Sequence, residues 1–251
     1  MEIPDRKISC CLTIILACLA VPGVVSRIQA QEAVPAAFGP ALAATAGPAD
    51  ARALADPADS AWQKIQPNRV ALNRTPRLYE TEAPSEPEIA EVEVRVARTG
   101  GKLLVRLSWR DATQDAAKLA QAPGTPMEGR FLREPTEETS RFFDAAAIMV
   151  PTAVKAAASP SLQMGDPRDP VTIYYWNAAR GAMLMEAQGR ETTRRTGQTF
   201  PARAAYQGGI WSVAFELAGL PPGAPLAFAV WNGSQQDRDG RKYFSVWHWL
   251  G

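Results

Sequence analysis

Residues 91–109 read EVEVRVARTGGKLLVRLSW, and this stretch decides the fold class. Valines alternate with charged residues between Val92 and Val96, which is the period-2 pattern of a strand with one buried face. Gly100-Gly101 follows, and then a second apolar run extends from Leu103 to Trp109. Paired glycines between two such runs favour a tight turn, so the stretch predicts a β-hairpin.

Similar signals recur along the rest of the chain. Short runs rich in apolar, β-branched or aromatic residues, separated by Gly and Pro, predict further strands at 145–150, 171–176, 183–185, 203–206, 210–217, 226–231 and 243–250. Short helices are predicted at 115–121 and 137–142, within a connection too long for a plain hairpin loop. Many short strands and few helices predict a mainly β fold, an antiparallel β-sandwich with a few short helices in long loops.

The N-terminal segment has the pattern of an export leader. Arg6-Lys7 forms a short basic head, an apolar run extends from Ile8 to Val25, and Ala30 offers a small residue for cleavage. We therefore expect residues 1–30 to be a signal peptide. A lipid anchor at Cys18 is the less favoured alternative, since the preceding residues only loosely resemble a lipobox.

The next segment, 31–58, is dominated by Ala and Pro and is predicted to be a flexible segment. The folded β-sandwich domain is then expected over 59–251. Beyond the leader no apolar run approaches the roughly 20 residues that span a bilayer, so we expect no membrane span.

Composition excludes several kinds of site. All three cysteines lie in the leader, at positions 10, 11 and 18, and His248 is the only histidine. Once the leader is removed, the chain can hold no disulfide, no cysteine-ligated zinc, no iron–sulfur cluster and no thioether-linked haem. Removing the leader's three basic and two acidic residues from 27 Lys+Arg and 26 Asp+Glu leaves equal numbers of each sign, which indicates no nucleic-acid-binding surface.

A few residues could carry chemistry, and each has a simpler structural interpretation. The seven tryptophans are best interpreted as packing residues, with an aromatic platform for sugars or a flat cofactor as the alternative. Met164 lies in a loop, where methionine usually fills a gap in a core. Lys242 ends a charged turn, and a histidine placed like His248 is more often a hydrogen-bonded structural residue. On a continuous strand over 243–250, Lys242 and His248 would share one face.

Two pairs of segments resemble a known family when they are read together. They are SLQMGDP at 161–167 with PVTIYYW at 170–176, and FAVWNGS at 228–234 with DGRKYFSVW at 239–247. They resemble the ethylbenzene dehydrogenase γ-subunit type of haem-binding domain, and FDAAA at 143–147 also fits. The resemblance covers residues 57–251. This family supplies the b-haem subunits of periplasmic molybdenum enzymes of the dimethyl sulfoxide reductase superfamily.

The resemblance implies a cofactor and its ligands. One haem b would lie within the β-sandwich without covalent attachment, and its iron would take a methionine thioether and a lysine amine as axial ligands. The methionine of the family's Met-Gly-Asp motif falls on Met164, and the lysine after its Gly-rich turn falls on Lys242. His248 is the rival of Lys242 as a metal ligand, because a Met/His pair is common in haem proteins.

A lysine ligand brings its own requirement. Its amine must be neutral, so its pKa must fall from roughly 10.4 through burial and competition from the metal. We therefore expect Lys242 to be shielded from water and to lack a carboxylate partner, which makes the orientation of Asp237 and Asp239 decisive. Six residues along a continuous strand span about 20 Å, so Lys242 and His248 would not both reach one iron.

The resemblance also implies a role. The chain is expected to be a non-catalytic b-type cytochrome subunit of a periplasmic heterotrimer, together with a molybdopterin catalytic subunit and an iron–sulfur subunit. It would transfer electrons between the iron–sulfur subunit and a soluble cytochrome or similar carrier. The alternative function is a carbohydrate-binding β-sandwich module of an exported protein, in which exposed aromatic residues would stack on sugars.

Overall fold

The computed structural model describes residues 38–48, 51–75, 88–116, 142–154 and 160–251. These residues belong to a unit that extends from Pro35 to Gly251. The predicted signal peptide at 1–30 lies outside the described residues, and so do nearly all residues of the helices predicted at 115–121 and 137–142.

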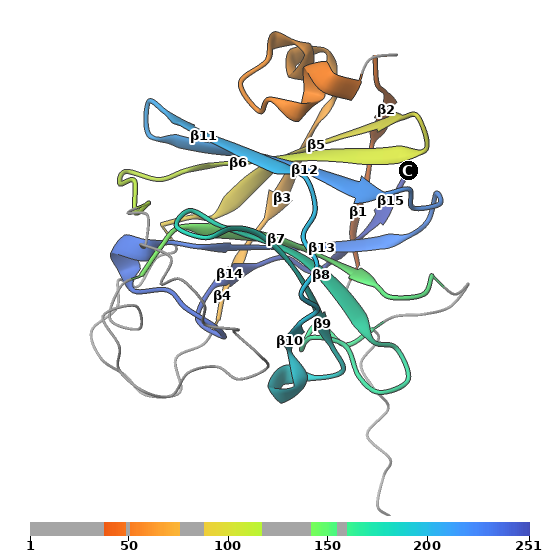
Figure 1. The fold of residues 1–251 in the computed structure, drawn as a ribbon, viewed down its shortest axis with the longest axis vertical. Coiled ribbons are helices and arrows are strands. Elements are labelled where there is room, and N and C mark those ends of the chain that lie inside the picture. The colour runs from red at the N-terminus through yellow and green to blue at the C-terminus, as the bar shows by residue number, and fades with distance from the viewer. Residues whose placement is uncertain (1–37, 49–50, 76–87, 117–141, 155–159) are drawn as a thin grey trace, which may run out of the picture. The chain divides into compact units, whose positions relative to one another are not determined.

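Two β-sheets face each other in this unit (Figure 1). The nine-stranded sheet has the order β1 (Phe38–Leu42), β15 (Trp247–Leu250), β13 (Pro225–Trp231), β7 (Ala145–Pro151), β8 (Val171–Asn177), β9 (Gly181–Ala187) and β10 (Arg194–Arg195), with β14 (Tyr243–Phe244) paired to β13 and β4 (Asn73–Arg74) paired to β14. The six-stranded sheet has the order β11 (Ala202–Gln207), β12 (Ile210–Ala218), β6 (Lys102–Arg110), β5 (Glu91–Thr99) and β2 (Ala44–Ala46), with β3 (Pro67–Ala71) paired to β5. Among the described strands every pair is antiparallel except β1 with β15 and β2 with β5. The prediction of a mainly β, antiparallel sandwich is therefore confirmed.

Both hairpins predicted from paired glycines are present. Gly100 and Gly101 connect β5 to β6 with φ angles of 53° and 75°, and Gly208 and Gly209 connect β11 to β12 with 57° and 75°. Two successive positive φ angles are the requirement of the hairpin turns that match strand twist, and glycine meets this requirement without a steric penalty.

The main core lies between the two sheets. Every second residue of β5, β6 and β12 points into it, including Val94, Val105 and Phe215, and meets Ile148 of β7 and Phe228 of β13. Because side chains alternate along a strand, the intervening residues of β7, β8 and β13 lie on the outer face of the nine-stranded sheet. That outer face carries a separate apolar cluster.

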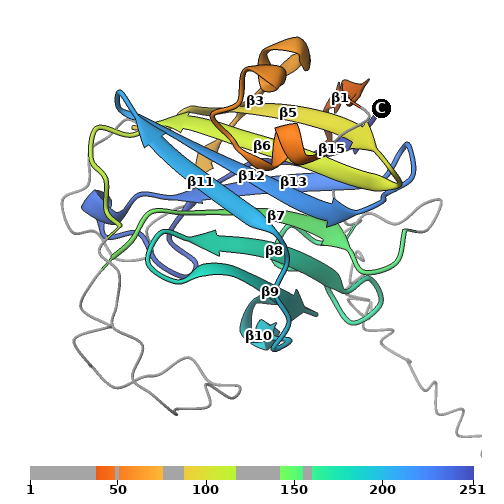
Figure 2. The same ribbon diagram turned by 45° about the horizontal axis from the view of Figure 1, so that its top comes forward.

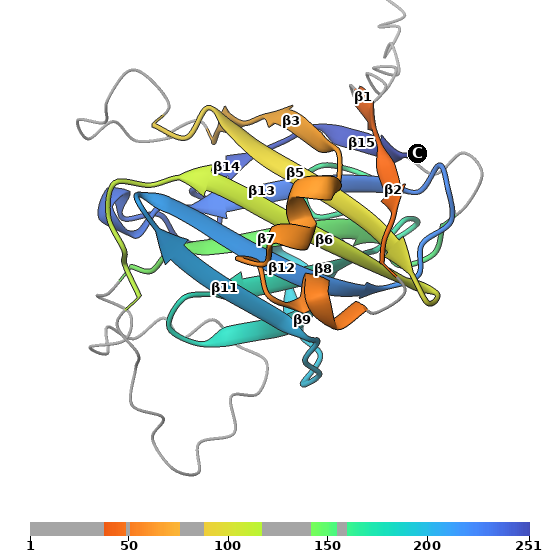
Figure 3. The ribbon, with the colours of Figure 1, turned by 90° about the horizontal axis from the view of Figure 1, so that it is seen from above.

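The Ala/Pro-rich range 31–58 differs from the flexible segment expected there. Its described residues include β1 and β2, which pair with strands of the two sheets, and the 3₁₀ turn η1 (Ala51–Ala55). Together with η2 (Ser60–Lys64), η1 covers the outer face of the six-stranded sheet (Figures 2 and 3). The composition suggested disorder because large apolar residues are few. Pairing at a sheet edge, however, uses backbone groups and does not require large side chains. In addition, Leu42 and Leu54 are almost fully buried.

The strand predicted over 243–250 is divided into β14 and β15. Ser245 lies at the division, where its hydroxyl accepts a hydrogen bond from the Phe228 N–H at 2.9 Å. The two-residue interruption changes the alternation of side chains. Phe244 and Trp247 consequently pack on the same outer face of the nine-stranded sheet, an arrangement that one continuous strand would not allow.

Asp144, which directly precedes β7, connects three segments from a fully buried position. Its carboxylate accepts hydrogen bonds from the backbone N–H groups of Asp115 and Gly233, at 2.7 and 2.9 Å, and from the Trp211 indole at 2.9 Å. Burial raises the pKa of Asp144 to about 7, and the negative charge of Asp111 adds to the rise while the hydrogen-bond donors oppose it.

This raised pKa predicts a pH-dependent stability. Asp144 binds a proton more tightly in the folded state, so its protonated carboxyl stabilises the fold. This stabilisation is fully present below the ordinary pKa of 3.8 and is lost as pH rises through about 7. We expect the unfolding free energy of the wild type, relative to Asp144→Asn, to fall by at least about 1.4 kcal/mol over this range. Urea denaturation from pH 4 to pH 8 measures the difference, and a difference independent of pH would contradict the raised pKa.

Candidate functional site

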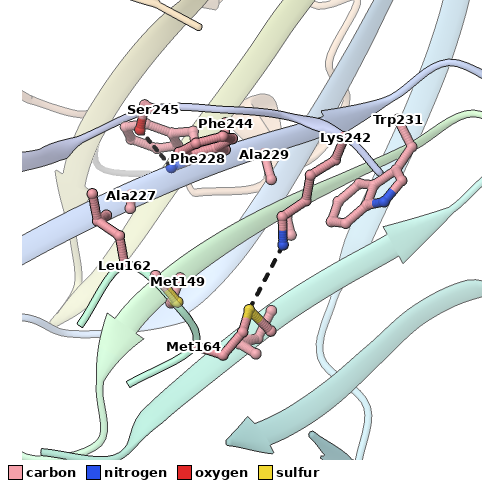
Figure 4. A pocket seen from close by; sticks show the side chains of 12 residues that line it. Met149, Leu162, Met164, Ala227, Phe228, Ala229, Trp231, Lys242, Phe244 and Ser245 are labelled. Carbon is pink, nitrogen blue, oxygen red and sulfur yellow. Dashed lines mark hydrogen bonds between the residues drawn. The ribbon is translucent and has the colours of Figure 1, made fainter. Parts of the chain in front are cut away.

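Small side chains form the floor of a pocket on the outer face of the nine-stranded sheet. Ala147 of β7 lies opposite Ala229 of β13, and Ala227 of β13 lies opposite Met149 of β7. Alanines leave space above the sheet, and the open pocket there contains about 400 Å³ of empty space, which includes open solvent (Figure 4). Its lining comprises Ala147, Met149, Leu162, Met164, Ile173, Ala227, Phe228, Ala229, Trp231, Lys242, Phe244 and Ser245.

The loop before β8 carries Met164 into this pocket. Met164 and Gly165 both have positive φ angles, 73° and 72°, which is uncommon for a methionine. Two backbone hydrogen bonds hold the turn: the Gly165 N–H donates to the Ser161 carbonyl at 2.8 Å, and the Gly189 N–H donates to the Met164 carbonyl at 2.9 Å. A Cβ at position 165 would lie 2.8 Å from the Asp169 carbonyl oxygen, so the turn requires glycine after Met164.

Lys242 enters the pocket from the other side. Its backbone is fixed next to β4, because the Lys242 carbonyl accepts hydrogen bonds from the Thr75 N–H and hydroxyl, both at 2.9 Å. The side chain extends over the alanine floor, with Nζ 3.7 Å from Met164 Sδ and 5.2 Å from the centroid of the Trp231 ring (Figure 4). Two residues 78 positions apart in the sequence thus bring a thioether and an amine face to face.

Burial lowers the pKa of Lys242 to about 8, with a further decrease from the positive charge of Arg190 and an opposing effect from Asp239. The two nearby carboxylates face other partners. Asp237 accepts two hydrogen bonds from Arg74, at 2.7 and 2.6 Å, and Asp239 lies 3.6 Å from Arg238. Among the described residues, no carboxylate lies within ion-pair distance of the Lys242 amine. This is the environment expected of a lysine that has to lose its proton.

His248 lies away from the pocket. Its ring packs near Phe228 on the inner side of the sheet, with Nδ1 2.9 Å from the Pro40 carbonyl oxygen, and it occupies the space where a Cβ at Gly39 would stand. The interruption between β14 and β15 places Lys242 on the outer face instead. The structure therefore brings Met164 and Lys242 together and separates His248 from both.

The pocket differs in one respect from what the resemblance implied. A cofactor within the sandwich was expected, whereas Met164 and Lys242 meet outside it, on the outer face of the nine-stranded sheet. The space between the sheets is already filled by side chains such as Ile148 and Phe228. The outer face was signalled in the sequence by alanines at every second position of β7 and β13, but alanine alone does not distinguish a pocket floor from tight packing.

The donor set limits the chemistry of the pocket. A neutral amine and a thioether are both ligands for iron, and the thioether favours the ferrous state. The lining contains no carboxylate and no histidine. Among the described residues no group of three or more His, Cys, Asp or Glu side chains is arranged to hold a metal ion. What the lining offers is one amine and one thioether, facing each other over an apolar floor.

Three relatives are similar to the chain in sequence. The chain is 32% identical over 204 residues to a putative respiratory nitrate reductase heme subunit of Haloferax mediterranei, covering 76% of this chain and 66% of the relative. It is 28% identical over 171 residues to the chlorate reductase subunit gamma of Ideonella dechloratans, covering 63% of each chain. It is 27% identical over 221 residues to the dimethylsulfide dehydrogenase subunit gamma of Rhodovulum sulfidophilum, covering 78% of this chain and 73% of the relative. The matches therefore span slightly less than two thirds of the length of the first two relatives.

A solved carbohydrate binding module of family 9 from Caldicellulosiruptor kristjanssonii is similar at a TM-score of 0.37 and 9% identity, covering 82% of this chain and 84% of that chain. A likeness at this level carries no functional argument. No helix in the described part of the chain is long and apolar enough to cross a membrane.

The sequence profile of the family described as ethylbenzene dehydrogenase matches residues 59–208. The matched range includes Met164 and its loop, whereas Lys242 follows it in the chain. Because this range is more than half of the chain, and because the three relatives agree with it, the protein belongs to the ethylbenzene dehydrogenase family.

Proposed function

We propose that the chain is a non-catalytic b-type cytochrome subunit that binds one haem b non-covalently, with Met164 and Lys242 as axial ligands. The observation that carries this proposal is the 3.7 Å approach of Met164 Sδ and Lys242 Nζ within an apolar pocket. The name of the Haloferax mediterranei relative, a heme subunit, supports the cofactor.

When bound, the haem would supply one-electron redox chemistry. The residues of the chain would provide what that chemistry needs. Lys242 loses its proton more easily than an exposed lysine because burial lowers its pKa to about 8, so its lone pair is accessible near neutral pH. The Met164 turn presents the thioether, and the alanine floor receives a flat ring while the apolar lining excludes water.

The proposed partners follow from the relatives. Two of them are gamma subunits, one of chlorate reductase and one of dimethylsulfide dehydrogenase. We infer that this chain assembles with a molybdopterin catalytic subunit and an iron–sulfur subunit in the periplasm, after cleavage of a signal peptide at 1–30. It would then transfer electrons between the iron–sulfur subunit and a soluble cytochrome or similar carrier.

The purified protein, expressed in a haem-replete host, is expected to show a reduced-minus-oxidised spectrum of a six-coordinate low-spin b-type cytochrome. Pyridine haemochrome analysis should give one haem b per chain. A colourless protein from that host would contradict the proposed function.

The carbohydrate-binding alternative has weaker support. Six of the seven tryptophans are at most 7% exposed. Trp249, at 37%, is the exposed one, and its ring stacks on Phe38 at a centroid distance of 4.0 Å. A single exposed stacked pair is less than the open aromatic platform that sugar binding was expected to use. A colourless protein that polysaccharide resin retains would favour the alternative.

A further inference from the structure

The 3₁₀ turn η3 (Arg190–Thr192) contacts both segments that carry the proposed ligands. On one side, the N–H of the preceding residue, Gly189, donates the hydrogen bond to the Met164 carbonyl. On the other side, Nη2 of Arg190 lies 3.8 Å from the position that a Cβ at Gly240 would occupy, two residues before Lys242. Arg190 is thus the basic side chain that lies where the two loops approach each other.

The charges around Arg190 are unbalanced. Arg190 is an exposed residue, and among the described residues no carboxylate is within ion-pair distance of its guanidinium. Arg194 of β10, four residues later in the chain, has Glu186 at 3.1 Å, so the region does supply a carboxylate elsewhere. Arg190 instead lies beside Gly240, two residues before Lys242. A cationic side chain that has no carboxylate partner among the described residues, at the edge of an apolar site, favours an anion as its partner.

We propose that Arg190 binds a carboxylate of the pocket's ligand, namely a propionate of the haem. This inference rests on the proposed function. The porphyrin would place its apolar face on the alanine floor and its carboxylates at the rim, and Arg190 lies outside the lining, beside Gly240. An arginine suits this role because its planar guanidinium can donate two parallel hydrogen bonds to one carboxylate. Arg190 would be a positioning residue, since it does not ligate the metal.

The test compares haem with its dimethyl ester, which has the same ring and iron but no free carboxylate. Both are titrated into the purified chain after removal of any bound haem. In Arg190→Gln, the affinity for haem should fall on the order of tenfold, as for the loss of one charge-assisted hydrogen bond, while the affinity for the ester stays equal to that of the wild type. Any effect of Arg190 on Lys242 alters both titrations equally, so the comparison removes it.

Arg194→Gln is the matched control, because Arg194 is a nearby exposed arginine that already has a carboxylate partner. It should leave both affinities unchanged. An equal loss for haem and ester in Arg190→Gln, or no loss for either, would overturn the assignment of Arg190 alone. A wild-type chain that gives a six-coordinate low-spin spectrum with neither compound overturns the proposed function, and the inference with it.

Discussion

Met164→Leu is expected to convert the six-coordinate low-spin haem into a high-spin form and to weaken haem binding by on the order of 100-fold, because a direct ligand matters at least as much as the outer groups that orient ligands. Leucine has nearly the volume of methionine, so the packing of the loop should change little. It also has the same Cβ, so the backbone strain at a φ of 73° is the same in both proteins. The sulfur is therefore the one property that the substitution removes.

Met149→Leu provides the matched control. Met149 lines the same pocket, but the Lys242 amine lies next to Met164 (Figure 4). Absorption and electron paramagnetic resonance spectra of the two variants, recorded at one pH, make the comparison. A low-spin spectrum retained in Met164→Leu and lost in Met149→Leu would refute the assignment of Met164. The more conservative pair of leucine substitutions separates loss of a ligand from loss of volume, which Met164→Ala would combine.

Lys242→Leu is expected to have two effects of opposite sign. The low-spin spectrum should be lost, whereas the haem-free protein should become more stable at pH 7 by about 1–3 kcal/mol, because a buried amine that is protonated in water no longer has to be desolvated. A lysine with a purely structural role would give the reverse, a less stable protein with an unchanged spectrum. Opposite effects on cofactor binding and on stability are typical of functional residues.

The stability effect of Lys242 has a defined pH range. Its pKa is about 8 in the folded state and 10.5 ordinarily, so the unfolded chain binds the proton more tightly. Above pH 10.5 the amine is neutral in both the folded and the unfolded chain, so it does not lower the unfolding free energy. As pH falls from 10.5 to about 8, the unfolded chain takes up the proton first and the unfolding free energy decreases. Below about pH 8 this decrease is complete and stays constant. Urea denaturation of haem-free wild type and Lys242→Leu should therefore give a gap at pH 7 that closes towards pH 10.5.

Two further variants complete this comparison. Lys102→Leu changes an exposed lysine paired with Glu216, and its effect on stability should stay within about 0.5 kcal/mol at both pH values. His248→Ala should leave the low-spin spectrum intact, since His248 lies on the other face of the sheet. If His248→Ala gave a high-spin spectrum while Lys242→Leu stayed low-spin, His248 and not Lys242 would be assigned as the ligand.

Local patterns predicted most of the strands. The alternation in β5 and the glycine pairs at 100–101 and 208–209 define their hairpins without long-range information, because period and turn conformation are local properties. β1 and β2 were not predicted, since they pair through backbone groups with strands far away in the sequence. Residues 243–250 have the appearance of one strand, and the hydrogen bond of the Ser245 hydroxyl that accompanies the interruption comes from distant Phe228.

The candidate site was predictable only in part. Met164 and Lys242 came from the resemblance of their segments to a family, and neither composition nor spacing indicated that they meet. Their approach depends on the pairing of β7 with β8 and β13, which brings the two loops over one surface. Arg190 had no sequence signal at all, because its position follows from the Gly189 hydrogen bond to Met164. The separation of Lys242 and His248 onto opposite faces of the sheet depends on the interruption between β14 and β15.

The alanine floor provides a criterion that applies to relatives known only from their sequences. A chain can keep both proposed ligand residues and still be unable to load a cofactor, if a bulky side chain replaces Ala147 or Ala229 and fills the space above the sheet. Such a chain would have a structural role in its complex and would not transfer electrons. Genome surveys that count redox carriers should therefore inspect two unremarkable alanines as well as the methionine and the lysine.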